Sequence, residues 1–316
     1  MGRSIERPRP FRLKAHLPDA KRQQLWILFT PEVSASEDDV EGACGLADNS
    51  RRLGPKLTHL RVALPPSYAK LEAEKRLRLE QFLSFATSLH VEAKAAASYD
   101  ALANCLLGGE AHVAWAPPFT CARLENAGIP VLVRAVRKGA ATYRAALMCQ
   151  SATPVHLEKL RGLRAAWVDR ESTGGYLLAA GFLKGRGVEL DKTFSSQVFV
   201  GSYQAALNAV VTGQADVSSV YAPPSEVGSA LALEDVLPGK ASHLKAIAFT
   251  DEAPNDGVAL APFTPPVLVR AIEQAFVGAS ELPMGPDVLK LFHAESFEVA
   301  PKNGYRALYL ALRSLR

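Results

Sequence analysis

Two stretches of the chain, 104 residues apart, carry closely similar sequences. Residues 98–118 read SYDALANCLLGGEAHVAWAPP, and residues 202–224 read SYQAALNAVVTGQADVSSVYAPP. Over the first sixteen positions seven residues are identical at matching places, and after a slip of two residues both copies reach an aromatic residue followed by Ala-Pro-Pro. A short repeating period would indicate a solenoid, whereas one doubling at this distance indicates a pair of similar units. We therefore expect two related lobes.

Short apolar runs alternate with helix-like segments around both copies. The strands expected from these runs are 60–64, 91–97, 112–116, 129–136, 163–168, 197–200 and 216–221. The expected helices are 69–89, 99–107, 121–126, 176–184, 203–211, 267–277 and 286–294. Strands that alternate with helices of about ten residues form βαβ units and a parallel sheet. The sequence therefore predicts an α/β protein with a sheet in each lobe.

The segment after residue 250 is too short for a third domain, so we expect it to return to the first lobe. The expected organisation is an N-terminal extension at 1–57, a first lobe at 58–142 and 257–316, and a second lobe at 143–256. The chain is expected to cross between the lobes near residues 139–144 and 251–257.

The charge of the chain is concentrated in the N-terminal extension. Its first 24 residues hold seven basic and two acidic side chains, so the rest of the chain sums to −1 although the formal net charge is +4. An acidic stretch, SEDDVEGACGLA, follows. Three prolines prevent a continuous amphipathic helix in the basic part. Nothing beyond the extension favours nucleic-acid binding.

Several classes of chemistry lack their sequence signals. The four cysteines show no CxxC spacing and are expected to be buried thiols, and the seven histidines are dispersed. The chain contains neither GxGxxG, nor GxxxxGK[ST], nor GxSxG. We therefore expect no catalytic set, metal or cofactor. The apolar run at residues 25–29 is too short for a signal peptide or a membrane span, so a cytoplasmic protein without membrane insertion is expected.

Candidate ligand residues lie where strands end and helices begin, because ligands of open α/β sheets bind beyond the carboxyl ends of the strands. The loops in this position are 65–68, 97–99, 169–176 and 201–203. The third, DRESTGGY, is the most informative. Ser172 and Thr173 offer hydroxyls, and Gly174 and Gly175 allow a ligand to approach free backbone N–H groups at a helix start. An ordinary N-cap would give the same residues.

Aromatic residues also occupy matching places in the two copies. Tyr99 and Tyr203 each follow a serine at a helix start, and Trp115 and Tyr221 each end a strand before Ala-Pro-Pro. Aromatic side chains from both lobes would line a cleft between them. Packing within an interlobe core would explain each of them singly.

In these residues the chain resembles the substrate-binding proteins of phosphate, phosphite and phosphonate ABC transporters. The similarity runs from about residue 60 to Tyr305 and rests on STGGY, GSYQAAL, GQAD and PNDG in this order. It implies a two-lobed type II periplasmic-binding-protein-like fold, in which each lobe is a mostly parallel sheet flanked by helices and the ligand cleft lies between the lobes. Members of this family are usually periplasmic or surface-anchored.

The resemblance implies a non-enzymatic protein that captures a small oxyanion-bearing ligand, such as a phosphonate, phosphate, phosphite or another small acid, for ABC-type uptake or for sensing. The expected partners are this ligand and an ABC permease or a regulatory protein, and a monomer is expected. The expected ligand-binding residues are Tyr68, Tyr99, Trp115, Ser172, Thr173, Gly174, Gly175, Ser202, Tyr203 and Tyr221.

The chain departs from the family pattern at three places. The family commonly has His where Tyr203 stands and an Asp near Tyr221 that meets a ligand amine, and His112 stands at the place of Asp216 in the other copy. An acid with an apolar or aromatic body is therefore favoured over an aminoalkyl phosphonate, and His112 is expected to cap or pack a turn. Two alternatives stay open. One is a cytoplasmic enzyme on the same fold, with His112 or Asp100 as its base, and the other is a regulatory protein whose residues 1–57 bind a partner.

Overall fold

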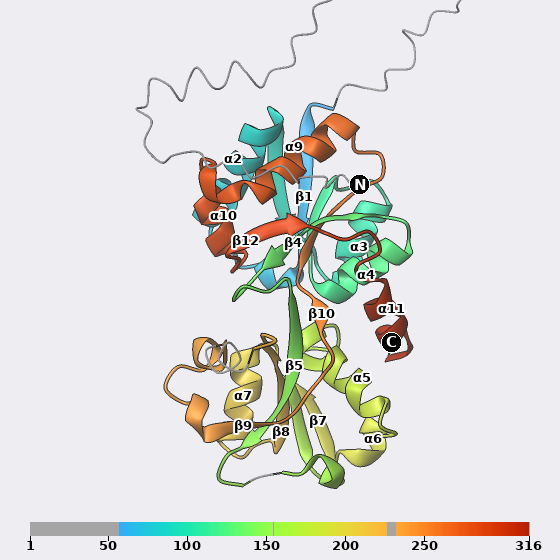
Figure 1. Ribbon diagram of the computed structural model, residues 1–316, viewed down its shortest axis with the longest axis vertical. Coiled ribbons are helices and arrows are strands. Elements are labelled where there is room, and N and C mark those ends of the chain that lie inside the picture. Colours follow the sequence, from blue (N-terminus) through green and yellow to red (C-terminus); the bar gives the residue numbers. More distant parts are fainter. Residues whose placement is uncertain (1–56, 154, 226–231, 316) are drawn as a thin grey trace, which may run out of the picture. The chain divides into compact units, whose positions relative to one another are not determined.

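The structure, a computed structural model, describes residues 57–153, 155–225 and 232–315 (Figure 1). Residues 56–316 form one compact unit. The expectations for the N-terminal extension, including its binding of a partner, fall outside the described residues. Among the described residues, no helix is both long and apolar enough to cross a membrane.

The first sheet has six strands in the order β12-β4-β11-β3-β1-β2. These are β1 His59–Leu64, β2 His90–Ala95, β3 Val113–Ala116, β4 Val131–Val136, β11 Gly257–Leu260 and β12 Ser296–Val299. β1 pairs in parallel with β2 and β3, whereas β11 lies antiparallel between β3 and β4 and β12 lies antiparallel to β4. Thus β1 to β4 share one direction, and the strands that follow the second sheet run the opposite way.

Helices cover both faces of the first sheet. They are α2 Ala73–Thr87, α3 Tyr99–Leu107, α4 Pro118–Asn126, α9 Pro266–Val277, α10 Gly285–Leu291 and α11 Arg306–Leu312. α2, α9 and α10 pack with Leu60, Val62 and Leu64 of β1 on one face, while α3 and α4 pack with Ala63 on the other. The alternation of side chains along β1 accounts for this division. We call the first sheet and these helices the first lobe.

The second sheet has the order β10-β5-β8-β6-β7, with β9 paired to β5. Its strands are β5 Thr142–Gln150, β6 Arg164–Trp167, β7 Ser196–Phe199, β8 Val217–Ala222, β9 Leu244–Phe249 and β10 Ala253–Pro254. Its helical segments are a π-helical turn at Thr173–Leu177, α5 Leu178–Lys184, α6 Leu190–Thr193 and α7 Tyr203–Val211. β6 pairs in parallel with β7 and β8, and β5 alone runs against its neighbours. We call this sheet and its helices the second lobe.

The two-lobed α/β fold expected from the sequence is therefore confirmed, with most strands of each sheet running in one direction. The lobe boundaries expected at residues 142 and 256 stay a prediction.

The two sequence copies form equivalent structural units. α3 and α7 begin and end 104 residues apart, as the sequence predicts. Ser98 caps α3 by accepting from Ala101 N at 3.0 Å, and Ser202 caps α7 by accepting from Ala205 N at 3.1 Å. Gly109 and Gly213, which follow the helices, have φ of 76° and 71°, a region that glycine enters without strain.

His112 and Asp216 make equivalent hydrogen bonds in the two copies. His112 Nδ1 accepts a hydrogen bond of 3.0 Å from Arg61 N, the backbone group at that point of β1. Asp216 Oδ2 accepts one of 2.7 Å from Arg164 N of β6. Each side chain thus pairs a backbone donor of the neighbouring strand, as expected for a turn-packing role.

The chain crosses between the lobes twice, through residues 137–141 and residues 250–256, which we call the crossing segments. They lie side by side because Ala253 and Pro254 of β10 pair with Tyr143 and Thr142 of β5 (Figure 1). Asn255 joins them, because its backbone N–H donates to Ala141 O at 2.9 Å and its side-chain amide donates to Ala140 O at 2.9 Å.

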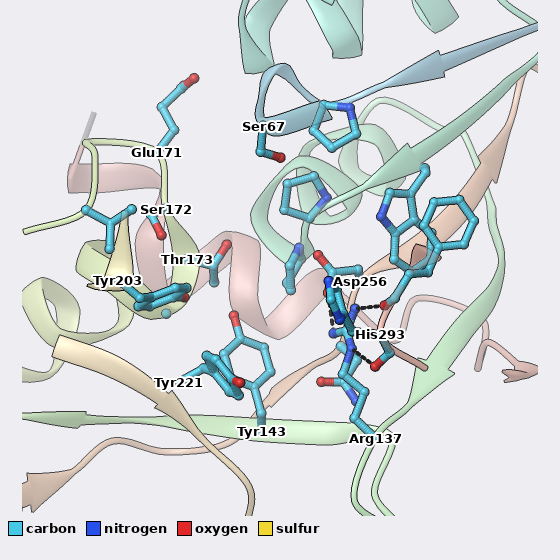
Figure 2. A pocket seen from close by; sticks show the side chains of 18 of the residues that line it. Ser67, Arg137, Tyr143, Glu171, Ser172, Thr173, Tyr203, Tyr221, Asp256 and His293 are labelled. Atoms are coloured by element: carbon cyan, nitrogen blue, oxygen red, sulfur yellow. Dashed lines mark hydrogen bonds and ion pairs between the residues drawn. The ribbon is translucent and has the colours of Figure 1, made fainter. Parts of the chain in front are cut away.

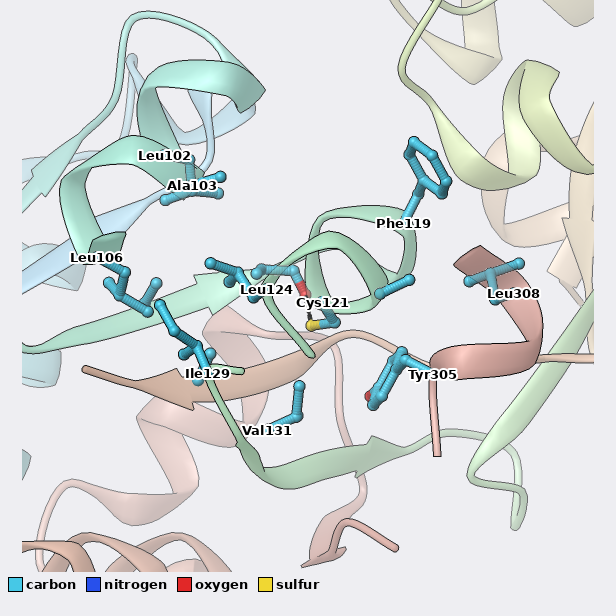
Figure 3. Packing of buried hydrophobic residues seen from close by; sticks show 14 of the residues in the cluster. Leu102, Ala103, Leu106, Phe119, Cys121, Leu124, Ile129, Val131, Tyr305 and Leu308 are labelled. Atoms are coloured by element: carbon cyan, nitrogen blue, oxygen red, sulfur yellow. Dashed lines mark hydrogen bonds between the residues drawn. The ribbon is translucent and has the colours of Figure 1, made fainter. Parts of the chain in front are cut away.

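An apolar cluster continues from the first lobe into the second. Figure 3 shows its first-lobe part, including Phe119 and Cys121 of α4 together with Leu308 of α11. The same cluster contains Leu177 and Leu178 of the second lobe. Cys121 and Cys149 are buried and Cys105 is partly buried, while Cys44 lies outside the described residues. Burial raises the pKa of the Cys121 thiol, which keeps it protonated.

We predict that His112→Ala lowers the free energy of unfolding by about 1–3 kcal/mol, because Arg61 N–H loses its acceptor in a partly buried place. His112→Asp, which introduces the residue of the other copy, should lose less. Burial, and then the charge of Arg61, lowers the pKa of His112 from its usual 6.5. The stability that the neutral ring contributes is therefore present above pH 6.5 and lost as the pH falls through the lowered pKa. Urea unfolding between pH 5 and pH 8 measures both effects, and equal stability of parent and His112→Ala would contradict the assignment.

Candidate ligand-binding site

A cavity of about 1240 Å³ lies where the strands of both lobes end and their helices begin (Figure 2). Its walls include residues from each of the four loops expected from the sequence, namely 65–68, 98–99, 169–174 and 201–203. Of the ten expected ligand-binding residues, those that line it are Tyr68, Tyr99, Trp115, Ser172, Thr173, Gly174, Ser202, Tyr203 and Tyr221.

Helix starts from both lobes face this cavity. Ser98 and Tyr99 begin α3, and Ser202 and Tyr203 begin α7. Pro117 and Pro118 at the start of α4 also line the cavity, but they carry no backbone N–H and add only the dipole of their helix. The first N–H groups of a helix have no carbonyl partner within the helix, and they carry the positive end of its dipole. Several such ends converging on one cavity favour an anionic group without any paired Lys or Arg.

The STGG turn, residues 172–175, is fixed by its own hydrogen bonds. Ser172 accepts from Gly175 N at 3.2 Å and so caps the helical segment that follows. Asp169 Oδ1 accepts from Glu171 N at 2.7 Å, which shapes the loop before the cap. Ser219 of β8 donates to Gly174 O at 2.7 Å and ties the turn to the sheet. The N–H groups of Thr173 and Gly174, in the first turn, have no carbonyl to bond within the helix.

Gly174 and Gly175 are both needed because a side chain at either position would collide with a neighbour, but the neighbours differ. A Cβ on Gly174 would lie 2.7 Å from the hydroxyl of Tyr203 and 3.1 Å from Cε2 of Tyr143, so glycine lets two phenols approach the backbone. A Cβ on Gly175 would lie 2.4 Å from Cγ2 of Val168, and Gly175 is not among the residues that line the cavity. Close packing against the end of β6 thus accounts for this glycine, and its contact with a ligand stays a prediction that the cavity lining does not support.

Thr173 connects the two lobes directly. Its Oγ1 accepts a hydrogen bond of 3.2 Å from Phe119 N in the first turn of α4, and the residue is only 3% exposed. One unpaired N–H of the first lobe is thus satisfied by a hydroxyl of the second. Its hydroxyl hydrogen stays available to another acceptor, because a threonine hydroxyl donates one bond while accepting up to two.

Five tyrosines line the cavity, and burial keeps their hydroxyls protonated. Burial, followed by nearby carboxylate charges, raises the pKa of Tyr68 and of Tyr99 to about 12. Burial likewise raises the pKa of Tyr143, Tyr203 and Tyr221 above its usual value. These phenols are therefore neutral hydrogen-bond donors at physiological pH.

Trp115 lines the cavity but belongs mainly to the first-lobe core. It is 3% exposed, and its ring stacks on Phe292 with centroids 4.2 Å apart. Phe297 packs against its edge. Since one ring face is already covered, Trp115 shapes a rigid wall rather than offering an open stacking surface.

Charged residues of the crossing segments also reach the cavity, and the sequence analysis did not identify them. Arg137 forms an ion pair with Asp256 and donates to the carbonyls of Phe292 and His293 at 3.0 and 3.1 Å. Lys138 pairs with Asp235 at 3.1 Å. The Arg137 guanidinium is thus held by three groups of the protein. The PNDG motif, which contains Asp256, was the available signal for this part of the site.

Asp169 differs from Asp256 and Asp235, which are paired with cations. It lines the cavity beside the STGG turn, and no ion pair to it is found among the described residues. Burial raises its pKa, against a smaller opposite effect of the Ser172 N–H. Its carboxyl group faces the same space as the helix starts.

The residues considered as a catalytic base lie elsewhere. Neither His112 nor Asp100 lines the cavity; His112 is bonded to Arg61 N, and Asp100 pairs with Arg123 at 2.6 Å. Within the part of the chain that the structure describes, no cluster of three or more His, Cys, Asp or Glu residues could hold a metal ion.

A family model described as "ABC transporter, phosphonate, periplasmic substrate-binding protein" matches residues 62–305, which is well over half of the chain. The chain belongs to this family. The match includes both lobes and the STGG turn, and it ends at Tyr305, whose hydroxyl bonds Asn255 O in a crossing segment. The resemblance drawn from the sequence is confirmed.

Solved structures share the fold of this family member. XAC2383 from Xanthomonas citri bound to ATP aligns with a TM-score of 0.70 at 18% identity, over 82% of this chain and 98% of that one. PhnD1 from Prochlorococcus marinus in complex with methylphosphonate aligns with a TM-score of 0.66 at 19% identity, over 82% and 98%. A binding protein component of an ABC phosphonate transporter from Pseudomonas aeruginosa gives 0.64 at 18% identity, over 81% and 86%.

We predict that Gly174→Val abolishes ligand binding by this phosphonate-family protein, because the added side chain would displace the Tyr203 hydroxyl and fill the approach to the turn. Calorimetric titration of folded protein measures the effect. Gly185→Ala, at the far end of α5 and outside the cavity, is the control for replacing a glycine as such; a Cβ there would lie 3.3 Å from Gly181 O, a tight contact that a small local shift relieves. Unchanged binding by Gly174→Val would show that no ligand approaches this turn.

Proposed function

We propose that this protein is a non-enzymatic binding protein that captures a small phosphonate, or another small oxyanion-bearing acid, and delivers it to an ABC permease. The observation that carries the proposal is the convergence of helix starts from both lobes on one cavity beside the STGG turn. Family membership supports the same role. The acid group would bind the N–H groups of Thr173 and Gly174 and the hydroxyls around them.

The proposed site binds an anion with neutral donors. The cations Arg137 and Lys138 are paired with Asp256 and Asp235, so they add little net positive charge. Backbone N–H groups, two hydroxyls of the turn and the protonated phenols form the donor set. Neutral donors suit a protein that must release its ligand, because they need no strong Coulomb attraction to hold it.

We further propose that the protein acts as a monomer with lobes at 58–142 plus 257–316 and at 143–256. Uptake requires the protein on the periplasmic or outer side of the membrane, where the family description places its members. The cytoplasmic location expected from the sequence stays a prediction and would favour ligand sensing. Cell fractionation separates these two roles.

Isothermal titration calorimetry against methylphosphonate, phosphite, phosphate, acetate and ATP tests the proposed binding. Methylphosphonate and ATP enter the panel because structures with this fold contain them. We expect saturable binding of at least one phosphonate or phosphorus oxyanion by one protein molecule. The absence of binding across the panel, in a folded sample, would overturn the proposal.

We predict that Thr173→Ala weakens binding of the tightest panel ligand by about 1.5–3 kcal/mol, or about 10- to 150-fold, because a hydroxyl bond to a charged acceptor is lost. Thr173→Ser keeps the hydroxyl and should restore most of the affinity. Thr212→Ala is the matched control, since that hydroxyl bonds Asn208 O at the end of α7, away from the cavity. Equal affinity of Thr173→Ala and the parent would place the acid group elsewhere.

We predict that Asp169→Asn strengthens methylphosphonate binding by about threefold to tenfold at pH 7, because it removes a negative charge that faces the anion. Burial raises the pKa of Asp169, so the parent carboxylate becomes neutral as the pH falls through that raised value. The advantage of the variant should therefore shrink at acid pH. Titrations of both proteins at matched pH cancel the ionisation of the ligand itself. Asp191→Asn, outside the cavity, is the control, and weaker binding by Asp169→Asn would contradict the prediction.

A further inference from the structure

The C-terminal helix α11 packs against one helix from each lobe, outside the cavity. Its neighbours are α4 of its own lobe and α5 of the second lobe (Figure 1). Both of these helices begin at the cavity, because α4 begins at Pro118 and α5 continues directly from the STGG turn. They meet there, where Phe119 N donates to Thr173 Oγ1 at 3.2 Å. None of the residues 306–315 lines the cavity.

The start of α11 is fixed to α4 and to a crossing segment. Tyr305, the residue before the helix, is fully buried. Its N donates to Glu125 Oε2 near the end of α4 at 2.9 Å, and its hydroxyl donates to Asn255 O at 2.6 Å. Leu308, in the first turn of α11, is buried in the apolar cluster that contains Phe119 (Figure 3). The first half of α11 therefore belongs firmly to the first lobe.

The end of α11 contacts α5 of the second lobe. Leu312 is 2% exposed, and a Cβ on Gly181 of α5 would lie 2.7 Å from its Cδ2 and 3.7 Å from Cδ1 of Leu315. Glycine inside a helix costs stability relative to alanine, and here it lets the leucines of α11 approach the backbone of α5. Lys184, the last residue of α5, donates to the carbonyl and the hydroxyl of Ser314 at 3.1 and 3.3 Å. These contacts join the second lobe to the C-terminal residues.

We propose that residues 306–315 position the STGG turn: they hold α5 against α4, so that Thr173 stays beside Phe119 N and the anion-binding groups of the two lobes stay together. This inference rests on the proposed function. Residues 173–184 form one continuous helical segment, so a shift of α5 at Gly181 moves the turn with it. Lobes joined by short segments can rotate about them. A rotation that separates α5 from α4 must break the contacts of Leu312, because α11 stays with α4.

This positioning acts on affinity through the population of lobe arrangements. A ligand that bonds donors of both lobes binds only those molecules in which the donors lie together. Its apparent Kd is therefore the intrinsic Kd divided by the fraction of competent molecules. Shortening Leu312 lowers that fraction and changes no group that lines the cavity. The loss of affinity should be the same factor for every ligand.

Leu312→Ala tests the inference by calorimetric titration with methylphosphonate, phosphite and phosphate. Leu310→Ala is the matched control, because Leu310 lies on the same helix with 52% of its surface exposed. We expect Leu312→Ala to weaken the binding of each ligand that the parent binds by one common factor of about fivefold or more, and Leu310→Ala to change it by less than about twofold. Leu312→Met keeps most of the side-chain volume and should restore most of the affinity.

Hydrogen–deuterium exchange of the ligand-free protein gives a readout that needs no ligand. Leu312→Ala should exchange faster than the parent at residues 118–124 and 172–177, which contain Phe119 N–H and the STGG turn, and Leu310→Ala should not. If Leu312→Ala does not fold, Leu315→Ala takes its place, with an expected loss of affinity of about twofold or more, because this leucine is only partly buried.

The possible failures are distinguishable. A parent that binds a ligand, together with a folded variant of Leu312 or Leu315 that binds it equally well or exchanges at the parent's rate, overturns the inference alone. A parent that binds none of the three ligands overturns the proposed function and this inference with it.

Discussion

Asn255 holds together the places where the chain passes between its two sheets. Its side-chain amide donates to Ala135 O at 3.0 Å and to Ala140 O at 2.9 Å, and its own carbonyl accepts the Tyr305 hydroxyl at 2.6 Å. The residue is 2% exposed, so a lost bond would leave a buried polar group without a partner. These bonds set the positions of β5 and β10, and thereby of every cavity residue that the crossing segments supply.

The two lobes contribute different kinds of wall to the cavity, because matching positions of the two sequence copies hold different residues. Trp115 of the first copy packs on Phe292 and becomes part of a core, whereas Tyr221 of the second copy stays partly exposed and packs edge-on against Tyr203. The first lobe thus supplies the fixed wall at Trp115 together with the phenols of Tyr68 and Tyr99. The second supplies the turn with its hydroxyls and N–H groups. An acid group is expected at the second lobe and the organic body of the ligand against the first.

Much of the fold could be predicted because local signals agreed with each other. α3 and α7 have a capping serine, an apolar face and a glycine after the last turn, and their bounds follow from these residues. β5 was not predicted, because it is buried at most positions without alternation and has no crossover helix beside it. β11 and β12 are four residues each and find their places only through distant partners. Such strands depend on the tertiary arrangement rather than on local pattern.

The site was predictable to the extent that it follows from topology. Loops after parallel strands meet at one edge of a sheet, and this rule brought Tyr68, Tyr99, Thr173 and Tyr203 to one cavity. Arg137 and Asp256 come from the crossing segments and Tyr143 from the start of β5, so no βαβ unit contains them and they do not follow from this rule. In a two-lobed protein the segments that join the lobes supply site residues in addition to the loops of each lobe. They do so because they form the back wall of the cavity between the lobes. Residues at such crossings are therefore candidates for the ligand-binding set whenever a sequence predicts a doubled α/β unit.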